Sequence, residues 1–142
     1  MMFSTSCSAG GLIMIGLDTG YFLRLLKGHP EAGRIWTAIM DGEEAAVSCV
    51  TLCELARFAR KGSIDADAEK TLREAILALC RVCWLDREEI LLAAANLSQG
   101  AGLHAIDSLI LAGLLAVNAT AIYTTDRDFE AYKKKGVKIL RI

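Results

Sequence analysis

Short apolar segments alternate with longer segments of helical periodicity along almost the whole chain. The apolar segments are IMIGL at 13–17, AAVSC at 45–49, VCWL at 82–85, AIYTT at 121–125 and VKILRI at 137–142. Strands that alternate with helices are typical of a mostly parallel sheet covered by helices on both faces. The sequence therefore predicts an α/β fold, a three-layer α/β/α sandwich with a mostly parallel central sheet of about five strands.

The segments between these predicted strands begin and end at residues typical of helix termini. A helix over 20–26 ends at Gly28, a second begins at Pro30 and runs to about Met40, and a third ends at Gly62. Further helices are expected at 65–81, at 87–100 with Asp86 as a cap, at 105–118 and at 128–136. The 105–118 segment, AIDSLILAGLLAVN, is apolar on every side, so we expect it to be the central helix of the fold.

Length and composition limit the fold to one ordered domain. The chain has 142 residues, of which 54% are hydrophobic, and it has a single proline. These values exclude a largely disordered protein. The net charge of −1 gives no bulk attraction to nucleic acid, although a local basic surface is compatible with it.

The sequence shows neither a membrane span nor the basic start of a signal peptide. The longest apolar run in the second half, 109–117, is far shorter than the roughly 20 residues that a bilayer requires. No Lys or Arg precedes Arg24. We therefore expect a cytoplasmic protein. Because the periodic pattern starts near Met14, we expect a domain at 14–142 and an N-terminal extension or start-site artefact at 1–13.

Five cysteines include two closely spaced pairs, Cys49 with Cys53 and Cys80 with Cys83. A four-thiolate zinc site would require both pairs to converge from tight turns. Neither pair is flanked by glycines, and both lie within apolar periodic sequence, which favours buried free thiols over zinc ligands.

Acidic side chains follow the predicted strands. Asp18 and Asp126 come directly after two of them, and the carboxyl ends of parallel strands share one edge of a sheet, where ligands bind. Glu54 lies in the helix after the second strand. Asp107 opens the most apolar helix, which contains no Lys or Arg to neutralise it.

Four carboxylates gathered at one edge would repel one another. At an effective dielectric constant of about 20, two charges roughly 4 Å apart repel by about 4 kcal/mol. Mg²⁺ removes this repulsion, since it binds carboxylates and phosphate oxygens while keeping several waters, and it supports phosphodiester hydrolysis. Each acid alone also has an ordinary explanation: Asp18 as a turn residue, Glu54 as a solvated helix residue, and Asp107 and Asp126 as helix caps.

The order of these segments resembles that of the PIN-domain family, and especially of the VapC-like ribonuclease toxins of toxin–antitoxin pairs. The resemblance extends from Met14 to Ile142. It is carried by MIGLDTGYFLRLL, by SCVTLCELARFARKG with its central Glu, by HAIDSLILAGLLAVNATAIYTTDRDF and by the closing apolar segment.

This resemblance implies a catalytic and metal-binding set of Asp18, Glu54, Asp107 and Asp126. The expected reaction is Mg²⁺- or Mn²⁺-dependent endonucleolytic cleavage of RNA by an activated water. Thr124 corresponds to a supporting hydroxyl that orients a water, whereas Asp128 corresponds to a structural acid or helix cap. Gly20 stands where the family often has Ser or Asn. The resemblance therefore implies that a hydrogen bond in the outer shell of the acidic site is missing.

Partners follow from the same resemblance. It implies a twofold homodimer and a small antitoxin that wraps the helices and inserts a basic side chain into the acidic pocket. The apolar docking face would contain Leu23, Leu26, Ile35 and Ile39, unless these residues pack in the core. A catalytically silent PIN-like binding module is the alternative to an enzyme.

Basic side chains on the helices next to the acidic edge are candidates for contacts with the RNA backbone. They are Arg24, Lys27, Arg57, Arg60 and Lys61. His104 is expected to be a polar residue at a helix start, and the run 133–135 a solvated helix end.

Overall fold

Five parallel strands form one sheet in the part of the chain that the structure describes. The computed structural model describes residues 13–142, so positions 1–12 of the predicted N-terminal extension lie outside the described residues. The strands are β1 (Ile15–Leu17), β2 (Ala45–Ser48), β3 (Arg81–Cys83), β4 (Ala121–Thr124) and β5 (Lys138–Arg141). Their order is β3-β2-β1-β4-β5, and all neighbours are parallel, as the alternating pattern predicted.

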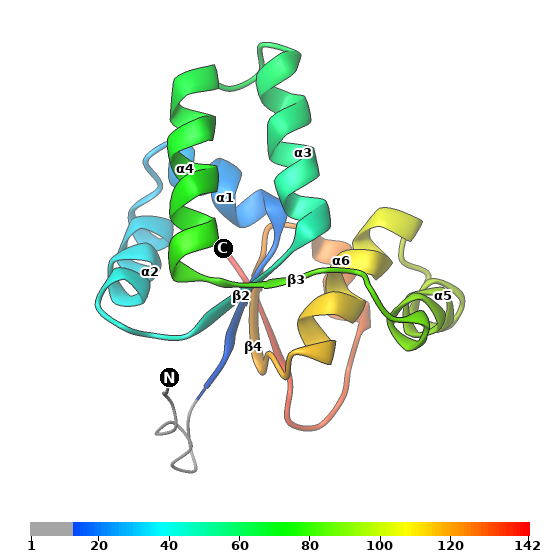
Figure 1. The fold of residues 1–142 in the computed structure, drawn as a ribbon. Coiled ribbons are helices and arrows are strands. Elements are labelled where there is room, and N and C mark those ends of the chain that lie inside the picture. The colour runs from blue at the N-terminus through cyan, green and yellow to red at the C-terminus, as the bar shows by residue number, and fades with distance from the viewer. Residues whose placement is uncertain (1–12) are drawn as a thin grey trace.

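Helices cover both faces of this sheet (Figure 1). They are α1 (Thr19–Leu26), α2 (Pro30–Met40), α3 (Cys49–Arg60), α4 (Ala66–Leu79), α5 (Glu88–Ala101) and α6 (Ala105–Ala116). Residues of α1 to α4 form one buried cluster with β1 and β2, and residues of α5 and α6 form a second cluster with β4. The predicted α/β/α sandwich is confirmed.

Helix α6 is the central helix of the second cluster, as its uniformly apolar sequence predicted. Six of its twelve residues are buried, and they include Ile110, Leu111 and Leu114. It packs against α5 and against β2 and β3 of the sheet. Gly113 permits this close approach, because a Cβ at that position would lie 3.2 Å from the sulfur of Cys83.

The predicted final helix over 128–136 is wrong. The segment instead forms a single 3-10 turn, η2 (Arg127–Ala131), and then a loop closed by a bridge between Lys134 and Val137. Phe129 is the only buried residue of the turn, so the segment lacks the apolar stripe that would hold a longer helix on the sheet. Residues 133–135 are therefore exposed loop residues and not a helix end.

Smaller corrections concern the segment around β3. The strand ends at Cys83, and Trp84, which follows it, is 54% exposed. The predicted cap of α5 by Asp86 is wrong. Arg87 occupies the cap position without a side-chain hydrogen bond, and the backbone N–H of Asp86 donates to the carbonyl of Trp84.

None of the helices in residues 13–142 combines the length and the apolar character that crossing a bilayer demands.

Candidate active site

The ends of the two central strands bring Asp18 and Asp126 to the same edge of the sheet. Asp18 directly follows β1, and Asp126 lies two residues after β4, which pairs with β1 in parallel register. Both carboxylates also cap the helical segment that follows. Asp18 accepts a hydrogen bond from the backbone N–H of Tyr21, and Asp126 accepts one from that of Asp128. The capping explanation is therefore confirmed for these two acids, and it is compatible with a shared site at this edge of the sheet.

Asp18 is the most constrained of the four acids. It is 4% exposed, and it accepts hydrogen bonds of 2.8 Å from the Tyr21 N–H and 2.5 Å from the Thr124 hydroxyl. Thr124 is fully buried and accepts a hydrogen bond from the backbone N–H of Asp126. A hydroxyl has one proton, so the proton of Thr124 points to Asp18. This geometry makes Thr124 a residue that holds Asp18 in place.

Glu54 and Asp107 come from helices that begin at the same edge. Glu54 lies in α3, directly after β2, and accepts a 2.6 Å hydrogen bond from the Thr19 hydroxyl. Asp107 lies in the first turn of α6, where the helix dipole favours a negative charge. His104, the cap residue of α6, is exposed and makes no capping hydrogen bond with its side chain.

The pKa shifts show that the four predicted acids influence one another. Burial raises the pKa of Asp18 to about 6, against the opposing hydrogen bonds from Thr124 and Tyr21, and the charges of Asp126 and Glu54 raise it further. Burial also raises the pKa of Asp107 to about 6, together with a hydrogen bond to Asp126 and the charges of Asp126, Glu54 and Asp18. The structure thus brings all four acids into one electrostatic cluster.

The carboxylate oxygens of the four acids are suitable ligands for a hard divalent cation. Mg²⁺ prefers oxygen ligands, and these acids supply only carboxylate oxygens. Within residues 13–142, no three His, Cys, Asp or Glu side chains lie close enough together to hold an ion in their present arrangement. A bound cation would therefore have to draw the carboxylates closer, and it would neutralise the repulsion that contributes to their raised pKa values.

Two buried threonines next to the acids were not singled out from the sequence. Thr19 is 8% exposed and Thr51 is fully buried, and their hydroxyl oxygens lie 3.0 Å apart. The only sequence signals are that Thr19 directly follows Asp18 and that Thr51 precedes Glu54 by three residues, on the same face of a helix.

The predicted RNA-contacting residues are all exposed on α1 and α3 or directly after them. Arg57 and Lys61 each lie 5.6 Å from the centre of the Phe58 ring, so the ring limits where both cations point. Arg60 donates a hydrogen bond to the carbonyl of Ala56. Helix α3 projects away from the sheet (Figure 1), so its basic residues lie farther from the sheet than Glu54 does.

The space left by the missing side chain of Gly20 is occupied by Thr125. A Cβ at position 20 would lie 1.9 Å from the hydroxyl oxygen of Thr125 and 3.0 Å from its Cβ. The Thr125 hydroxyl therefore fills the place where the side chain of residue 20 would begin. The departure at Gly20 and the threonine at 125 form one complementary pair.

The cysteine prediction is only partly confirmed. Cys83 is buried, whereas Cys49 and Cys80 are partly buried and Cys53 is exposed. Burial raises the pKa of the Cys80 thiol to about 11 and also raises that of Cys83. These two thiols are therefore protonated near neutral pH, as expected of packing residues.

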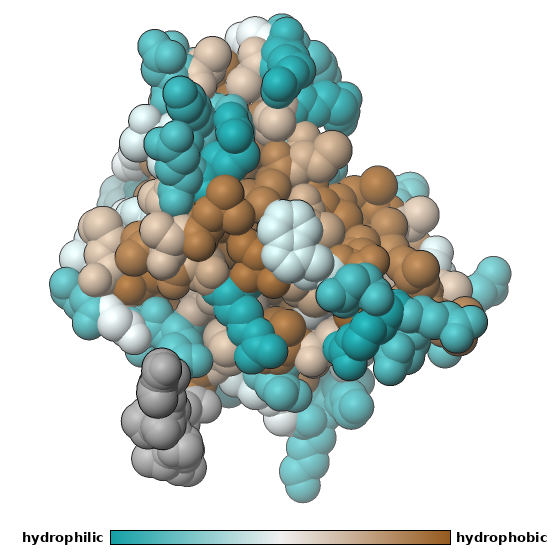
Figure 2. All heavy atoms as spheres, in the orientation of Figure 1, coloured by the Kyte–Doolittle hydropathy of each residue, from teal (hydrophilic) through white to brown (hydrophobic). Residues whose placement is uncertain are grey.

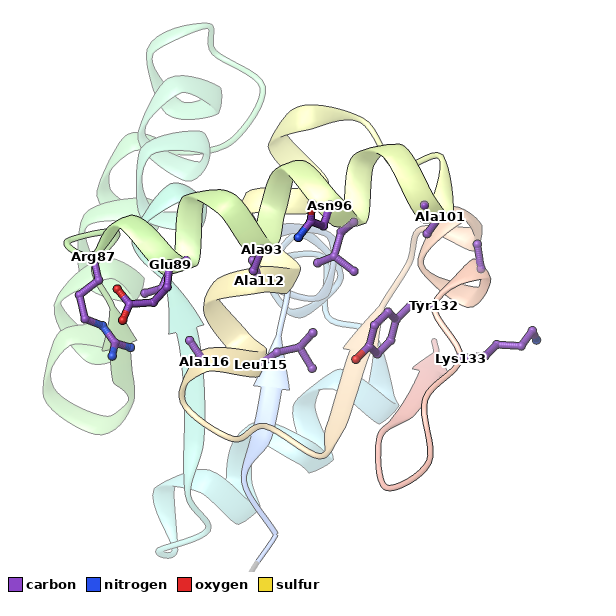
Figure 3. A pocket seen from close by; sticks show the side chains of 14 residues that line it. Arg87, Glu89, Ala93, Asn96, Ala101, Ala112, Leu115, Ala116, Tyr132 and Lys133 are labelled. Carbon is purple, nitrogen blue, oxygen red and sulfur yellow. The ribbon is translucent and has the colours of Figure 1, made fainter.

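A groove with a cavity of about 680 Å³ lies away from the acids, between α5, α6 and the residues after η2 (Figure 3). Ala93 of α5 and Leu115 of α6 contribute to its apolar walls, and Tyr132 points into it. None of the four acids lines this groove, so it is separate from the candidate active site.

A profile of the PIN domain matches residues 15–135, a span that contains all four acids. The chain belongs to the PIN-domain family. No curated protein matches the chain.

Solved structures confirm the PIN fold. VapBC2 from Rickettsia felis, bound to a DNA fragment from its promoter, has a TM-score of 0.69 and 17% identity, over 91% of this chain and 98% of that chain. A toxin–antitoxin complex from Klebsiella pneumoniae has a TM-score of 0.68 and 24% identity, over 87% and 94%. DNA-bound VapBC from Salmonella typhimurium has a TM-score of 0.68 and 21% identity, over 91% and 98%. At these identities the likeness establishes the fold.

The raised pKa values predict how pH affects the stability of the metal-free PIN domain. For Asp18 and Asp107 the folded pKa is about 6, whereas the ordinary value is 3.8. Between these values the folded state retains protons that the unfolded state has lost, so these two groups lower the free energy of unfolding as pH rises from about 4 to about 6. The loss is complete above pH 6.

Asp107→Asn removes one of the two ionisable groups, and with it part of the loss of stability above about pH 4. In EDTA at pH 7 the variant is expected to unfold with a free energy about 1 kcal/mol higher than wild type, a modest gain because water screens this half-buried carboxylate. At pH 4 the two proteins are expected to be equally stable. Urea unfolding at both pH values measures the difference, with exposed Asp128→Asn as control. Equal stability of wild type and Asp107→Asn at pH 7 would contradict the electrostatic account.

The complementary pair of Gly20 and Thr125 predicts a non-additive double substitution. Gly20→Ala is expected to lower the free energy of unfolding by about 1–3 kcal/mol, because the added methyl collides with a stiff β-branched side chain. Adding Thr125→Ala is expected to recover most of this loss. The control is Gly33→Ala in α2, where a Cβ meets open space, and it is expected to stabilise by up to about 1 kcal/mol. A stabilising effect of Gly20→Ala alone would show that the pair does not constrain the site.

Proposed function

We propose that this PIN domain is a Mg²⁺- or Mn²⁺-dependent endoribonuclease, and specifically a VapC-like toxin of a type II toxin–antitoxin system that acts in the cytoplasm. The family consists of nucleases, which supports hydrolysis of a phosphodiester bond as the reaction. The observation that carries the proposal is the electrostatic cluster of Asp18, Glu54, Asp107 and Asp126 at the carboxyl edge of the sheet.

The four acids have distinct structural supports for this role. Asp18 is fixed by Thr124 and the Tyr21 N–H, while Asp126 is fixed by its own capping bond. Asp107 lies in the first turn of α6, and the neighbouring Asp126 helps to raise its pKa, so the two carboxyl groups act on each other while no cation is bound. A Mg²⁺ or Mn²⁺ ion held here would supply charge neutralisation at the scissile phosphate and a more acidic attacking water.

Substrate binding would use the basic surface on α3. Arg57 and Lys61 are exposed and held against Phe58, about one and two helical turns beyond Glu54. Contacts from such side chains to phosphates position a nucleic acid without reading its sequence. With a net charge of −1, affinity for RNA depends on this local surface, and it is expected to fall with increasing salt.

The enzyme proposal is tested by cleavage of single-stranded RNA oligonucleotides by wild type, Asp107→Asn and Asp128→Asn. Wild type is expected to cut in Mg²⁺ or Mn²⁺ and to be inactive in EDTA. Asp107→Asn is expected to be inactive in all conditions, because it removes a carboxylate of the cluster. Asp128 is exposed and its side chain makes no hydrogen bond to the other acids, so Asp128→Asn is expected to cut at close to the wild-type rate.

Wild-type rates for Asp107→Asn, or activity that survives EDTA, would refute a metal-dependent nuclease centred on these acids. A melting temperature that rises with Mn²⁺ in the absence of any cleavage would instead favour the alternative, a catalytically silent PIN-like binding module.

An antitoxin is the expected protein partner, and the solved VapBC complexes support this proposal. The sequence left open whether the apolar residues Leu23, Leu26, Ile35 and Ile39 form a docking face or pack in the core. Ile35 and Ile39 are 9% and 3% exposed and belong to the core, so they are not available to a partner. Leu23 and Leu26 are only partly buried, and they are the members of that set that a partner can contact.

The proposed homodimer has a candidate surface at the end of α4 and after β3. Leu77, Leu79 and Trp84 are 51%, 42% and 54% exposed in this short stretch. Figure 2 shows apolar surface spread across this face, over the end of α4 and the edge strand β3. Exposed apolar surface of this kind is typical of an interface.

Light scattering at tens of micromolar protein tests the dimer. Wild type is expected to be a dimer, and Trp84→Lys is expected to shift it to monomer. Met40→Lys is the matched control, since Met40 is equally exposed at 54% but lies on α2. A monomeric wild type would count against the dimer, and a dimer that survives Trp84→Lys would count against this surface.

A further inference from the structure

Glu54 differs from the other acids in how it is held. Asp18 and Asp126 accept backbone N–H groups at helix starts, whereas Glu54 lies in the second turn of α3 and has no such donor. Among residues 13–142, no Lys, Arg or His forms an ion pair with it. Its hydrogen bond is the one from the Thr19 hydroxyl to Oε1, at 2.6 Å.

The direction of the hydrogen bonds around Thr19 follows from proton counting. An ionised carboxylate only accepts, so the single proton of the Thr19 hydroxyl points to Glu54. The Thr19 oxygen also lies 3.0 Å from the hydroxyl of Thr51, which must then be the donor of that bond. Thr51 is fully buried and Thr19 is 8% exposed, so the bond between the two hydroxyls is shielded from water, while the bond to Glu54 is partly buried.

We propose that Thr19, oriented by Thr51, is a positioning residue that aims the Glu54 carboxylate at the other three acids. The hydroxyl fixes Oε1 and leaves Oε2 without a hydrogen bond from the described residues, ready for a ligand. Thr124 does the same for Asp18, with the Asp126 N–H as its donor. The ends of β1 and β4 thus each contribute one threonine hydroxyl, Thr19 and Thr124. Each hydroxyl accepts a hydrogen bond from a neighbouring group and donates one to a carboxylate. The catalytic part of this inference rests on the proposed nuclease function.

Thr19→Val tests the inference, because it replaces the hydroxyl with a methyl group of similar size. Removing an outer hydrogen-bond partner of a metal ligand typically weakens metal binding by about 10- to 100-fold, and we expect a loss of that size in Mn²⁺ affinity, measured from the free-Mn²⁺ electron paramagnetic resonance signal. Thr19→Ser, which keeps the hydroxyl, is expected to stay close to wild type. Thr51→Val is expected to lie between them, and RNA cleavage by Thr19→Val is expected to lose kcat more than KM.

Wild-type Mn²⁺ affinity in Thr19→Val, or an equal loss in Thr19→Ser, would overturn the inference. If wild type binds Mn²⁺ but does not cut RNA, the nuclease proposal fails while the Mn²⁺ titrations still decide the role of Thr19.

If wild type binds no Mn²⁺ at all, a double-mutant cycle in EDTA decides the point. Thr19→Val and Glu54→Ala are expected to change the melting temperature non-additively, since each removes the same hydrogen bond. Thr37→Val combined with Glu54→Ala is the control and is expected to be additive, because Thr37 is exposed on α2 and bonds only to the carbonyl of Gly33. Additive shifts in the Thr19 cycle would overturn the inference.

Discussion

The hydrogen bond from Thr124 to Asp18 joins the ends of the two central strands, between residues 106 positions apart in the chain. It depends on the parallel pairing of β1 and β4, because only that register places Thr124 beside the residue after Leu17. The same threonine accepts the N–H of Asp126 and so fixes the backbone of a second acid. This one hydroxyl therefore fixes the relative positions of two of the four acids, Asp18 and Asp126.

The acidic edge also carries an unfavourable energy that the rest of the fold must offset. Burial and like charge raise the pKa of both Asp18 and Asp107 to about 6, which means that their ionised forms are destabilised in the folded state. Helix starts provide part of the compensation, since Asp18 and Asp126 cap helical segments and Asp107 lies in the first turn of α6. Under the proposed nuclease function a divalent cation would provide the rest, and the protein would then be more stable with the cation bound than without it.

The sequence predicted the parts of this structure that depend on periodicity and chain order. The parallel sheet, the central α6 and the convergence of Asp18 with Asp126 follow from apolar patterns and strand ends alone. The tertiary contacts could not be predicted this way. Thr19 and Thr51 contact each other across 32 residues, and nothing local distinguishes them from other threonines.

The errors have a common physical origin. The predicted helix over 128–136 contains good helix formers, but only Phe129 is buried, so no packing stabilises more than one turn. For Ile35 and Ile39 the sequence left a docking face and the core as alternatives, because an apolar stripe looks the same whether a partner or the core covers it. Local sequence indicates that a surface is apolar, and only the packed structure shows what lies against it.

The most direct test of this account is a crystal structure of the wild-type protein with saturating Mn²⁺, with anomalous scattering used to locate the ion. We predict one anomalous peak bounded by carboxylates of Asp18, Glu54, Asp107 and Asp126, with the Thr124 hydroxyl still bonded to Asp18. An ion bound elsewhere on the protein, or no peak at this edge of the sheet, would contradict the proposal that these four acids form a single metal-binding centre.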